Sequence, residues 1–207
     1  MLTLLGKSAS INVRKVLWTL TEIGVPFAHE EWGSGFQSTD TPQFRALNPN
    51  AMVPVLKDGD FVLWESNTIC RYLAARHGRD DLLPASPQAR ARVEQWMDWQ
   101  AGELNNAWRY AFMALVRNSP SHTDRTALDS SIDSWNRHMG MLDSQLEKTG
   151  AYAAGPDFTL ADIVLGLSVN RWLMTPIARP DYPAVSAYLQ RLRLRDGFRL
   201  HGANGMP

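Results

Sequence analysis

The chain has 207 residues, a formal net charge of zero and a single cysteine. This length allows one large domain or two small ones with a buried core, and a hydrophobic content of 44% argues against disorder. A neutral chain has no overall field that would attract nucleic acid or an anionic membrane. The lone Cys70 excludes an intramolecular disulfide, a C-x-x-C redox pair and a zinc site built from several thiolates.

No targeting or membrane segment is evident. The apolar part of residues 1–10 is too short for a secretory signal, and no run reaches the roughly 18 apolar residues of a membrane span. We therefore expect a soluble, cytoplasmic protein with no membrane and no nucleic acid as partner. A single cysteine is consistent with a reducing compartment.

The first third of the chain alternates between strand and helix signals. Residues 2–5 predict a short strand, and apolar residues then recur at helical spacing until Gly24, a candidate helix C-cap. Residues 25–32 predict a second strand. Further along, the signals are a short helix capped by Thr41 and begun by Pro42, strands over 53–57 and 61–64 joined by Asp58-Gly59, and a helix from Glu65 to Gly78.

The remainder of the chain reads as helices only. Residues 79–87 resemble a linker, and helical spacing then continues from residue 88 to Leu115 and again over 126–148. Thr159 and Asp162 form a capping-box pattern before an apolar run to Leu173, which predicts a buried central helix. The predicted fold is an α/β domain of order βαβαββα over 1–78, followed by an all-α domain over 88–207.

The loop after the first strand delivers Ser10 and Asn12 to the start of a helix. A helix N-terminus presents free N–H groups and a partial positive charge, so it stabilises an anion such as a thiolate. Ser and Asn are also favoured helix caps. From spacing alone, both roles are open for these two residues.

Two residue pairs could bind a peptide-like ligand. If the bond between Val53 and Pro54 is cis, the backbone of Val53 can act as a strand partner for an extended peptide. Glu65 and Ser66 begin the next helix, where Ser66 could hold a carboxylate and Glu65 an ammonium group. An ordinary strand entry and an ordinary helix cap are the alternatives.

Taken together, these motifs carry a family resemblance that covers essentially the whole chain. The residues are the run from Ser10 to Val16, Gly24 to Phe27, Asn48-Pro49, Val53-Pro54, Asp58-Gly59, Glu65-Ser66 and Phe158 to Asp162. In order and spacing they resemble cytosolic glutathione S-transferases, in particular the serine-type phi and theta classes and their bacterial relatives.

The resemblance implies a thioredoxin-like N-terminal domain that binds glutathione and a helical C-terminal domain that shapes the site of the second substrate. By position, Ser10 matches the hydroxyl that hydrogen-bonds the glutathione sulfur, with Asn12 as an auxiliary donor. Val53 before a cis Pro54 matches the grip on the cysteinyl unit, while Glu65 and Ser66 match the γ-glutamyl contacts.

The chain departs from the phi pattern at two places. A basic pair commonly holds the glycine carboxylate of glutathione before the second helix, where this chain has Thr39 and Asp40. A Gln often precedes the Val-Pro step, where this chain has Met52. Gln37 and Lys7 are the substitutes that we consider for the glycine end.

The other candidate groups point away from chemistry. His29, Glu30 and Glu31 are consecutive, so strand alternation separates them and no metal site is expected. Cys70 lies within a helix, where a small buried core residue is the simpler interpretation. Four aromatic residues could line an apolar pocket for the second substrate or belong to the core: Trp32, Phe36, Trp108 and Phe112.

The preferred hypothesis is a homodimeric glutathione transferase that joins glutathione to a small electrophilic or halogenated molecule and needs no metal. A non-catalytic glutathione-fold protein that binds or regulates is the alternative from another class. A glutathione-dependent thiol-disulfide reductase ranks last, because such relatives have Cys where this chain has Ser10.

Overall fold

A computed structural model describes residues 1–207. The N-terminal part contains β1 (Leu2–Leu5), α1 (Ile11–Ile23), β2 (Phe27–Glu30), α2 (Pro42–Leu47), β3 (Val55–Asp58), β4 (Phe61–Trp64) and α3 (Ser66–Arg76). From Pro87 onward the elements are α4 (Pro87–Trp99), the π-helical segment η1 (Gln100–Leu104), α5 (Asn105–Leu115), α6 (Arg125–Thr149), α7 (Leu160–Met174), α8 (Pro183–Leu192) and α9 (Asp196–His201). The predicted order βαβαββα followed by helices is confirmed.

The four strands form one mixed sheet in the order β2-β1-β3-β4. β1 pairs with β2 in parallel and with β3 in antiparallel orientation, and Leu4 lies opposite Leu56 in the second pair. β3 and β4 form the predicted hairpin around Asp58 and Gly59, whose φ of 61° suits a glycine. The sheet matches the thioredoxin-like arrangement expected for this part.

Local signals set several of the helix ends. Gly24 ends α1 in the left-handed conformation, and the Thr41 side chain accepts a hydrogen bond from the Phe44 amide (3.2 Å) at the start of α2. The capping box at α7 is present, and the Asp162 carboxylate accepts from the Thr159 amide (2.8 Å). These ends agree with the sequence predictions.

Three predicted elements differ from the structure, and the strand expected over 53–57 is β3, which begins two residues later at Val55. The second strand is shorter than residues 25–32 and covers only β2. The single long helix expected up to Leu115 is interrupted by η1 at Gln100, which is a buried polar residue on the predicted apolar stripe. A polar side chain at that depth must find partners, and the wider π-helical turn places it among them.

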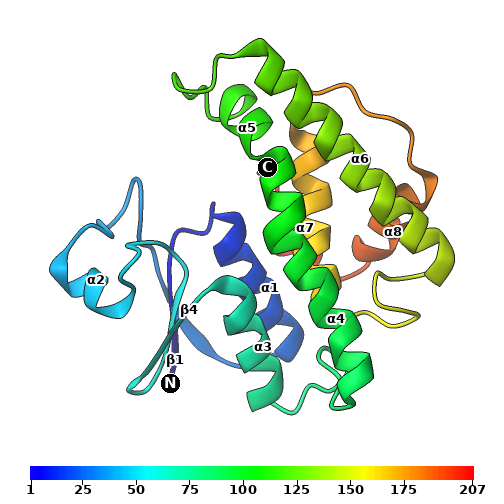
Figure 1. Ribbon diagram of the computed structural model, residues 1–207. Helices are drawn as coiled ribbons and strands as arrows, with labels where there is room; N and C mark the ends of the chain where they lie inside the picture. Colours follow the sequence, from blue (N-terminus) through cyan, green and yellow to red (C-terminus); the bar gives the residue numbers. More distant parts are fainter.

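The helices cover the two faces of the sheet unequally. Figure 1 shows α2 on one side of the sheet and α1 and α3 on the other, where they face α4 and α7. One hydrophobic cluster runs from Leu4 and Leu56 of the sheet through Trp18 of α1 to Leu160 and Leu167 of α7. No helix combines the length and apolar composition that crossing a bilayer requires.

Candidate active site

The loop that leads from β1 into α1 is held close to Val53. Gly6 has a φ of 147°, and a Cβ at this position would lie 2.6 Å from Cγ2 of Val13 and 2.9 Å from Cβ of Val53. Only glycine allows both this backbone conformation and this approach. The loop therefore brings the beginning of α1 beside the strand entry at Val53.

Ser10 occupies the N-cap position of α1 with an extended backbone, but its side chain makes no capping hydrogen bond. The hydroxyl of Ser10 therefore caps no amide of α1. The free amides of the first turn and the positive end of the helix lie beside it. This arrangement favours an anion at the Ser10 hydroxyl.

The other predicted glutathione-binding residues meet in one cavity of about 310 Å³, which we call the polar cavity. It is lined by Asn12, Asn48, Asn50, Met52, Val53, Pro54, Glu65 and Ser66. The peptide bond between Val53 and Pro54 is cis. Residues from three separate segments of the N-terminal part thus converge on one small polar space.

A buried asparagine that the sequence reasoning did not assign a role shapes the wall of the polar cavity. The Asn48 side chain donates to the carbonyl of Met52 (2.8 Å) and accepts from the amide of Asn50 (3.0 Å). These bonds fix the loop that leads to Val53. The Asn48-Pro49 step in the family motif was the signal that could have identified it.

Glu65 has a φ of 74°, a backbone conformation that residues other than glycine rarely adopt. It precedes α3, and its side chain is exposed on the rim of the polar cavity, while Ser66 next to it is buried. Backbone conformations of this kind cost about 1–3 kcal/mol and concentrate at functional sites. The carboxylate is placed to receive a cationic group.

Ser10 lines a second, neighbouring space of about 410 Å³, which we call the aromatic cavity. Its lining residues are Lys7, Ser10, Ile11, Trp108, Arg109, Phe112, Met113, Arg117, His122 and Arg171. The rings of Trp108 and Phe112 meet edge to face with centroids 5.4 Å apart. Two of the four aromatic residues considered for the second substrate are therefore beside Ser10.

The structure places the other two aromatic residues elsewhere. Trp32 packs against Phe44 of α2, with ring centroids 5.1 Å apart, and Phe36 is 56% exposed and lines neither cavity. Both follow β2 in a segment that runs toward α2, on the side of the sheet away from α5. Sequence alone did not reveal to which side this segment turns.

The residues considered for the glycine end of glutathione are also separated. Lys7 lines the aromatic cavity, whereas Gln37 is exposed and lines neither cavity. Asp40 forms an ion pair with Arg45 (2.9 Å), and Thr39 lines neither cavity. Of these four residues, only Lys7 is near Ser10.

Arg171 is the main residue of the aromatic cavity that the sequence reasoning missed. It was part of a helix interpreted as apolar on most sides, and its guanidinium lies 4.5 Å from the Trp108 ring and 4.1 Å from the Phe112 ring. Burial and the nearby Arg14 and Arg117 lower its pKa to about 9. An isolated arginine within an apolar run was the available signal.

The remaining titratable candidates are structural. Burial raises the pKa of Cys70 to about 11, so its thiol is unreactive at neutral pH, in agreement with the predicted core role. His29 donates a hydrogen bond from Nε2 to the carbonyl oxygen of Gly6 (2.7 Å). No group of three or more His, Cys, Asp or Glu side chains could hold a metal ion.

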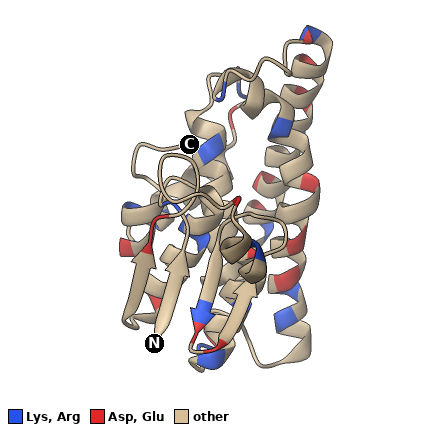
Figure 2. Ribbon diagram, turned by 90° about the vertical axis from the view of Figure 1, so that its left-hand side faces the viewer, with Lys and Arg blue, Asp and Glu red and all other residues tan.

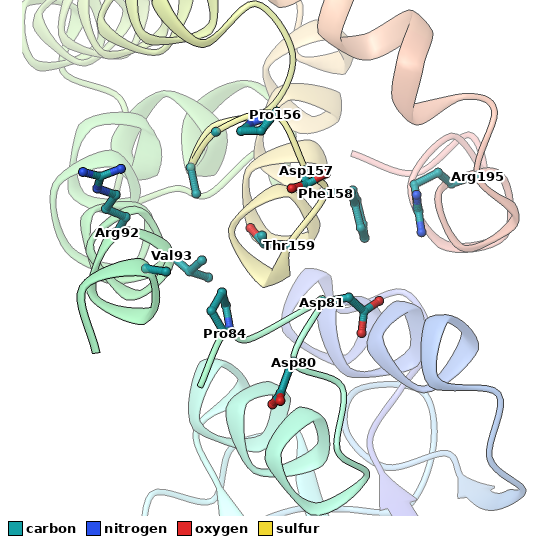
Figure 3. Close-up of a pocket in the computed structure, with 13 residues that line it drawn as sticks. Asp80, Asp81, Pro84, Arg92, Val93, Pro156, Asp157, Phe158, Thr159 and Arg195 are labelled. Atoms are coloured by element: carbon teal, nitrogen blue, oxygen red, sulfur yellow. The ribbon is translucent and has the colours of Figure 1, made fainter. Parts of the chain in front are cut away.

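The largest cavity, about 500 Å³, lies apart from these residues, between the linker, α4 and the loop before α7 (Figure 3). Arg195 at its edge forms an ion pair with Glu22 (2.6 Å) and covers the Phe158 ring at 3.7 Å. Asp81 pairs with Arg79 (2.7 Å). These two charges are satisfied within the protein, and none of the predicted glutathione-binding residues lines this cavity.

Comparison with known proteins identifies the family of the chain. The family model of the glutathione S-transferase N-terminal domain matches residues 9–76, and that of the C-terminal domain matches residues 104–196. The chain is 37% identical over 201 residues to glutathione S-transferase GstB of Escherichia coli strain K12, which covers 96% of both chains. This chain belongs to the glutathione S-transferase family.

Solved structures of family members are similar over the full length. A theta class glutathione S-transferase from Xanthomonas axonopodis pv. citri with glutathione bound has a TM-score of 0.91 and 36% identity, and covers 100% of this chain and 99% of its own. Glutathione transferase F7 from Populus trichocarpa has a TM-score of 0.87 and 25% identity, with full coverage of both chains. The present chain is thus a transferase with the glutathione S-transferase fold.

Proposed function

We propose that this transferase binds glutathione across the polar cavity, with the sulfur at Ser10, and transfers it to an electrophile in the aromatic cavity. The proposal rests on one observation. A single cavity is lined by Asn12, Val53, Glu65 and Ser66, and it lies beside the Ser10 hydroxyl, which makes no capping hydrogen bond to α1. Glu65 would receive the ammonium group of the γ-glutamyl unit, and Ser66 at the start of α3 its carboxylate. Val53 would pair with the cysteinyl backbone, and Asn12 would assist at the sulfur.

The groups at Ser10 are sufficient to ionise the thiol. A free thiol with a pKa near 8.5 is only about 3% thiolate at pH 7, and a decrease of about two pKa units requires about 2.7 kcal/mol. A hydrogen bond to a charged group contributes about 1.5–3 kcal/mol, and a helix N-terminus about 0.3–1 kcal/mol. No protein base is required.

The transfer step is a substitution at carbon. The thiolate sulfur provides the electron pair of the new carbon–sulfur bond, the carbon–halogen bond breaks, and the halide leaves with the electrons of that bond. The proton of the thiol has already gone to solvent. Trp108 and Phe112 give the aromatic cavity apolar walls, next to which a flat electrophile can lie near Ser10.

Conjugation of glutathione to 1-chloro-2,4-dinitrobenzene tests the role of Ser10. We expect Ser10→Ala to raise the pKa of the bound thiol by about one to two units and to lower kcat/KM at pH 6.5 about tenfold or more, because one hydrogen bond to the thiolate is lost. The difference in kcat/KM between Ser10→Ala and the wild type should shrink as the pH approaches the raised pKa of the bound thiol.

Ser8→Ala is the matched control, since Ser8 lies in the same loop but its hydroxyl donates to Glu31 (2.7 Å) and lines neither cavity. Its pH profile should follow the wild type. An unchanged rate of Ser10→Ala at neutral pH would sink the assigned role of Ser10.

We further propose that the N-terminal domain spans 1–78, the linker 79–87 and the helical domain 88–207, and that the protein is a cytoplasmic homodimer. The change from a mixed sheet to helices alone after α3 supports these boundaries. Family membership supports the dimer. Sedimentation velocity at micromolar concentration tests it, and a species with the mass of one chain would contradict it.

A further inference from the structure

Arg171 is a buried charge for which the protein provides no hydrogen-bonding partner. Only 4% of its surface is exposed, and its Nε has no hydrogen-bond acceptor. The ion pairs of the molecule are made by other arginines, at positions 45, 71, 76, 79, 125, 195 and 199. Because burying an unpaired charge is costly, a partner from outside the chain is the simplest compensation.

The position of the guanidinium shows where that partner would lie. Arg171 lines the aromatic cavity, and the rings of Trp108 and Phe112 hold it from two directions at 4.5 and 4.1 Å. Cation–π contacts of this kind stabilise the positive charge. They do not give the N–H groups of the guanidinium a hydrogen-bond acceptor. Nε is itself fully buried, so the two Nη groups are the donors that remain available to a ligand in the aromatic cavity.

The other charged residues around the aromatic cavity have the same sign. Lys7, Arg109 and Arg117 line it together with His122, and no Asp or Glu does. Elsewhere acidic and basic residues are interspersed along the helices and strands (Figure 2), as expected for a chain with no net charge. The excess of positive charge at the aromatic cavity is thus local and would attract an anion.

We propose that the second substrate is an aromatic electrophile that carries a carboxylate, bound through that group to the buried Arg171 guanidinium in the aromatic cavity. This inference rests on the proposed function, because it names the class of molecule that the thiolate at Ser10 attacks. The planar guanidinium matches a carboxylate with two parallel hydrogen bonds. Trp108 and Phe112 receive the ring, and Arg109 and Arg117 attract the anion toward the entrance.

The reaction remains a balanced substitution when the carboxylate is present. In a halogenated nitrobenzoate, the glutathione sulfur forms a bond to the ring carbon that bears the halogen, and the halide departs with the electron pair of the broken bond. The carboxylate takes no part in bond changes. Its role is to fix the ring so that the halogenated carbon faces the sulfur.

A matched pair of substrates isolates the carboxylate. The two compounds are 4-chloro-3,5-dinitrobenzoate and 4-chloro-3,5-dinitrobenzamide, which share the leaving group and the approximate size but differ in charge. Each kcat/KM is divided by the uncatalysed rate constant with glutathione, so that intrinsic reactivity cancels. We expect the wild type to favour the benzoate over the benzamide about tenfold or more, because a hydrogen bond to a charged group is formed only with the former.

Variants then assign the preference to Arg171. Arg171→Gln should lower the benzoate-to-benzamide ratio about tenfold to a hundredfold, and Arg171→Lys, which keeps the charge, should retain part of it. Arg137→Gln is the control, because Arg137 is an exposed arginine on α6 that lines none of the cavities described above. It should keep the wild-type ratio.

A binding readout separates positioning from chemistry and from misfolding. Inhibition constants of the unreactive 3,5-dinitrobenzoate and 3,5-dinitrobenzamide should show the same preference in the wild type and lose it in Arg171→Gln. Circular dichroism and a thermal melt establish whether each variant is folded, and the wild-type comparison needs no variant at all.

The outcomes distinguish the two proposals. Conjugation of both compounds with a ratio near one in the wild type would overturn the carboxylate assignment and leave the transferase function in place. Conjugation of neither compound, nor of 1-chloro-2,4-dinitrobenzene, would overturn the proposed function itself. A wild-type preference that survives in Arg171→Gln would show that the anion binds at another basic residue, and would also overturn the assignment.

Discussion

Glu65 combines a useful side chain with an unfavourable backbone. Its φ of 74° would suit glycine, yet a glycine would remove the carboxylate that lies on the rim of the polar cavity. A residue kept in such a conformation lowers stability in exchange for a fixed position. The binding role of the carboxylate and the cost of the strained backbone can be measured separately, because they respond to different substitutions.

We predict that two substitutions at Glu65 differ in their effect on stability and share an effect on glutathione binding. Glu65→Gln and Glu65→Gly should both raise the KM for glutathione, because each removes the negative charge. The free energy of unfolding of Glu65→Gly should exceed that of Glu65→Gln by about 1 kcal/mol, because only glycine adopts this backbone conformation without strain. Urea denaturation and glutathione titration measure the two quantities. Equal stability of the two variants would contradict the argument.

Sequence motifs pointed to those residues of the candidate site that begin a helix or a strand, and missed the residues that only the tertiary structure brings together. Ser10 and Glu65 were recognisable because each begins a helix in a recognisable order of elements. Arg171 meets Trp108 only after α7 packs beside α5, a contact between residues more than sixty positions apart. Trp32 was considered for the same cavity on composition, but its direction depended on the course of the loop.

At the level of elements, η1 interrupts the long helix where a polar network requires it. Gln100 accepts a hydrogen bond from the buried Lys15 of α1 (2.8 Å) and donates to Asn105 (2.9 Å), which in turn accepts from Trp108 (3.0 Å). Lys15 also donates to Asn67 (3.2 Å), the residue after Ser66. The network connects the beginning of α3 at the polar cavity with a wall of the aromatic cavity.

Lys15 makes stability depend on pH in a definable direction. Burial lowers its pKa from the usual 10.5 to about 8. Below pH 8 the lysine is protonated in both states, and the cost of burying its charge is constant. Between pH 8 and 10.5 the unfolded chain binds more protons than the native chain, so the free energy of unfolding rises with pH.

We therefore predict that the stability difference between wild type and Lys15→Met shifts in favour of the wild type by about 2 kcal/mol between pH 8 and pH 9.5. Urea denaturation of both proteins at several pH values measures it. Cys70, whose buried thiol has a raised pKa, acts in the opposite direction above pH 9, and its pKa also depends on the Lys15 charge, so both proteins carry Cys70→Ala. Parallel stability curves over this range would exclude a lowered pKa at Lys15.

The helical spacing that predicted one uninterrupted helix up to Leu115 could not reveal η1. Spacing records which side of a helix is apolar, and the four-residue steps from Trp96 to Trp108 continue that side across the wider π-helical turn. The hairpin at Asp58 and the capping box at Thr159 were predictable because a few adjacent residues specify each of them. The π-helical turn instead depends on a hydrogen bond from Lys15, which lies on another helix, to Gln100.

At the scale of the whole molecule, α1 joins the sheet to the helical part. Trp18 is fully buried, and its ring lies 5.9 Å from that of Phe158 and 5.3 Å from that of Phe198. Gly197 allows this packing, since a Cβ there would lie 2.1 Å from Cδ1 of Trp18. The hydrophobic cluster is therefore continuous from the sheet to α9. The N-terminal part and the helical part share this core at α1.

This continuity predicts that the two parts unfold together. In urea, circular dichroism and tryptophan fluorescence should report coincident transitions, and Trp18→Ala should lower the free energy of unfolding by about 3–5 kcal/mol without separating them, because the cavity it creates lies between the parts. Trp64→Ala is the control: Trp64 is 36% exposed on β4, so its removal should cost much less. Two resolved transitions in the wild type, or equal costs for the two tryptophans, would mean that the sheet and the helices are stabilised independently and that α1 does not couple them.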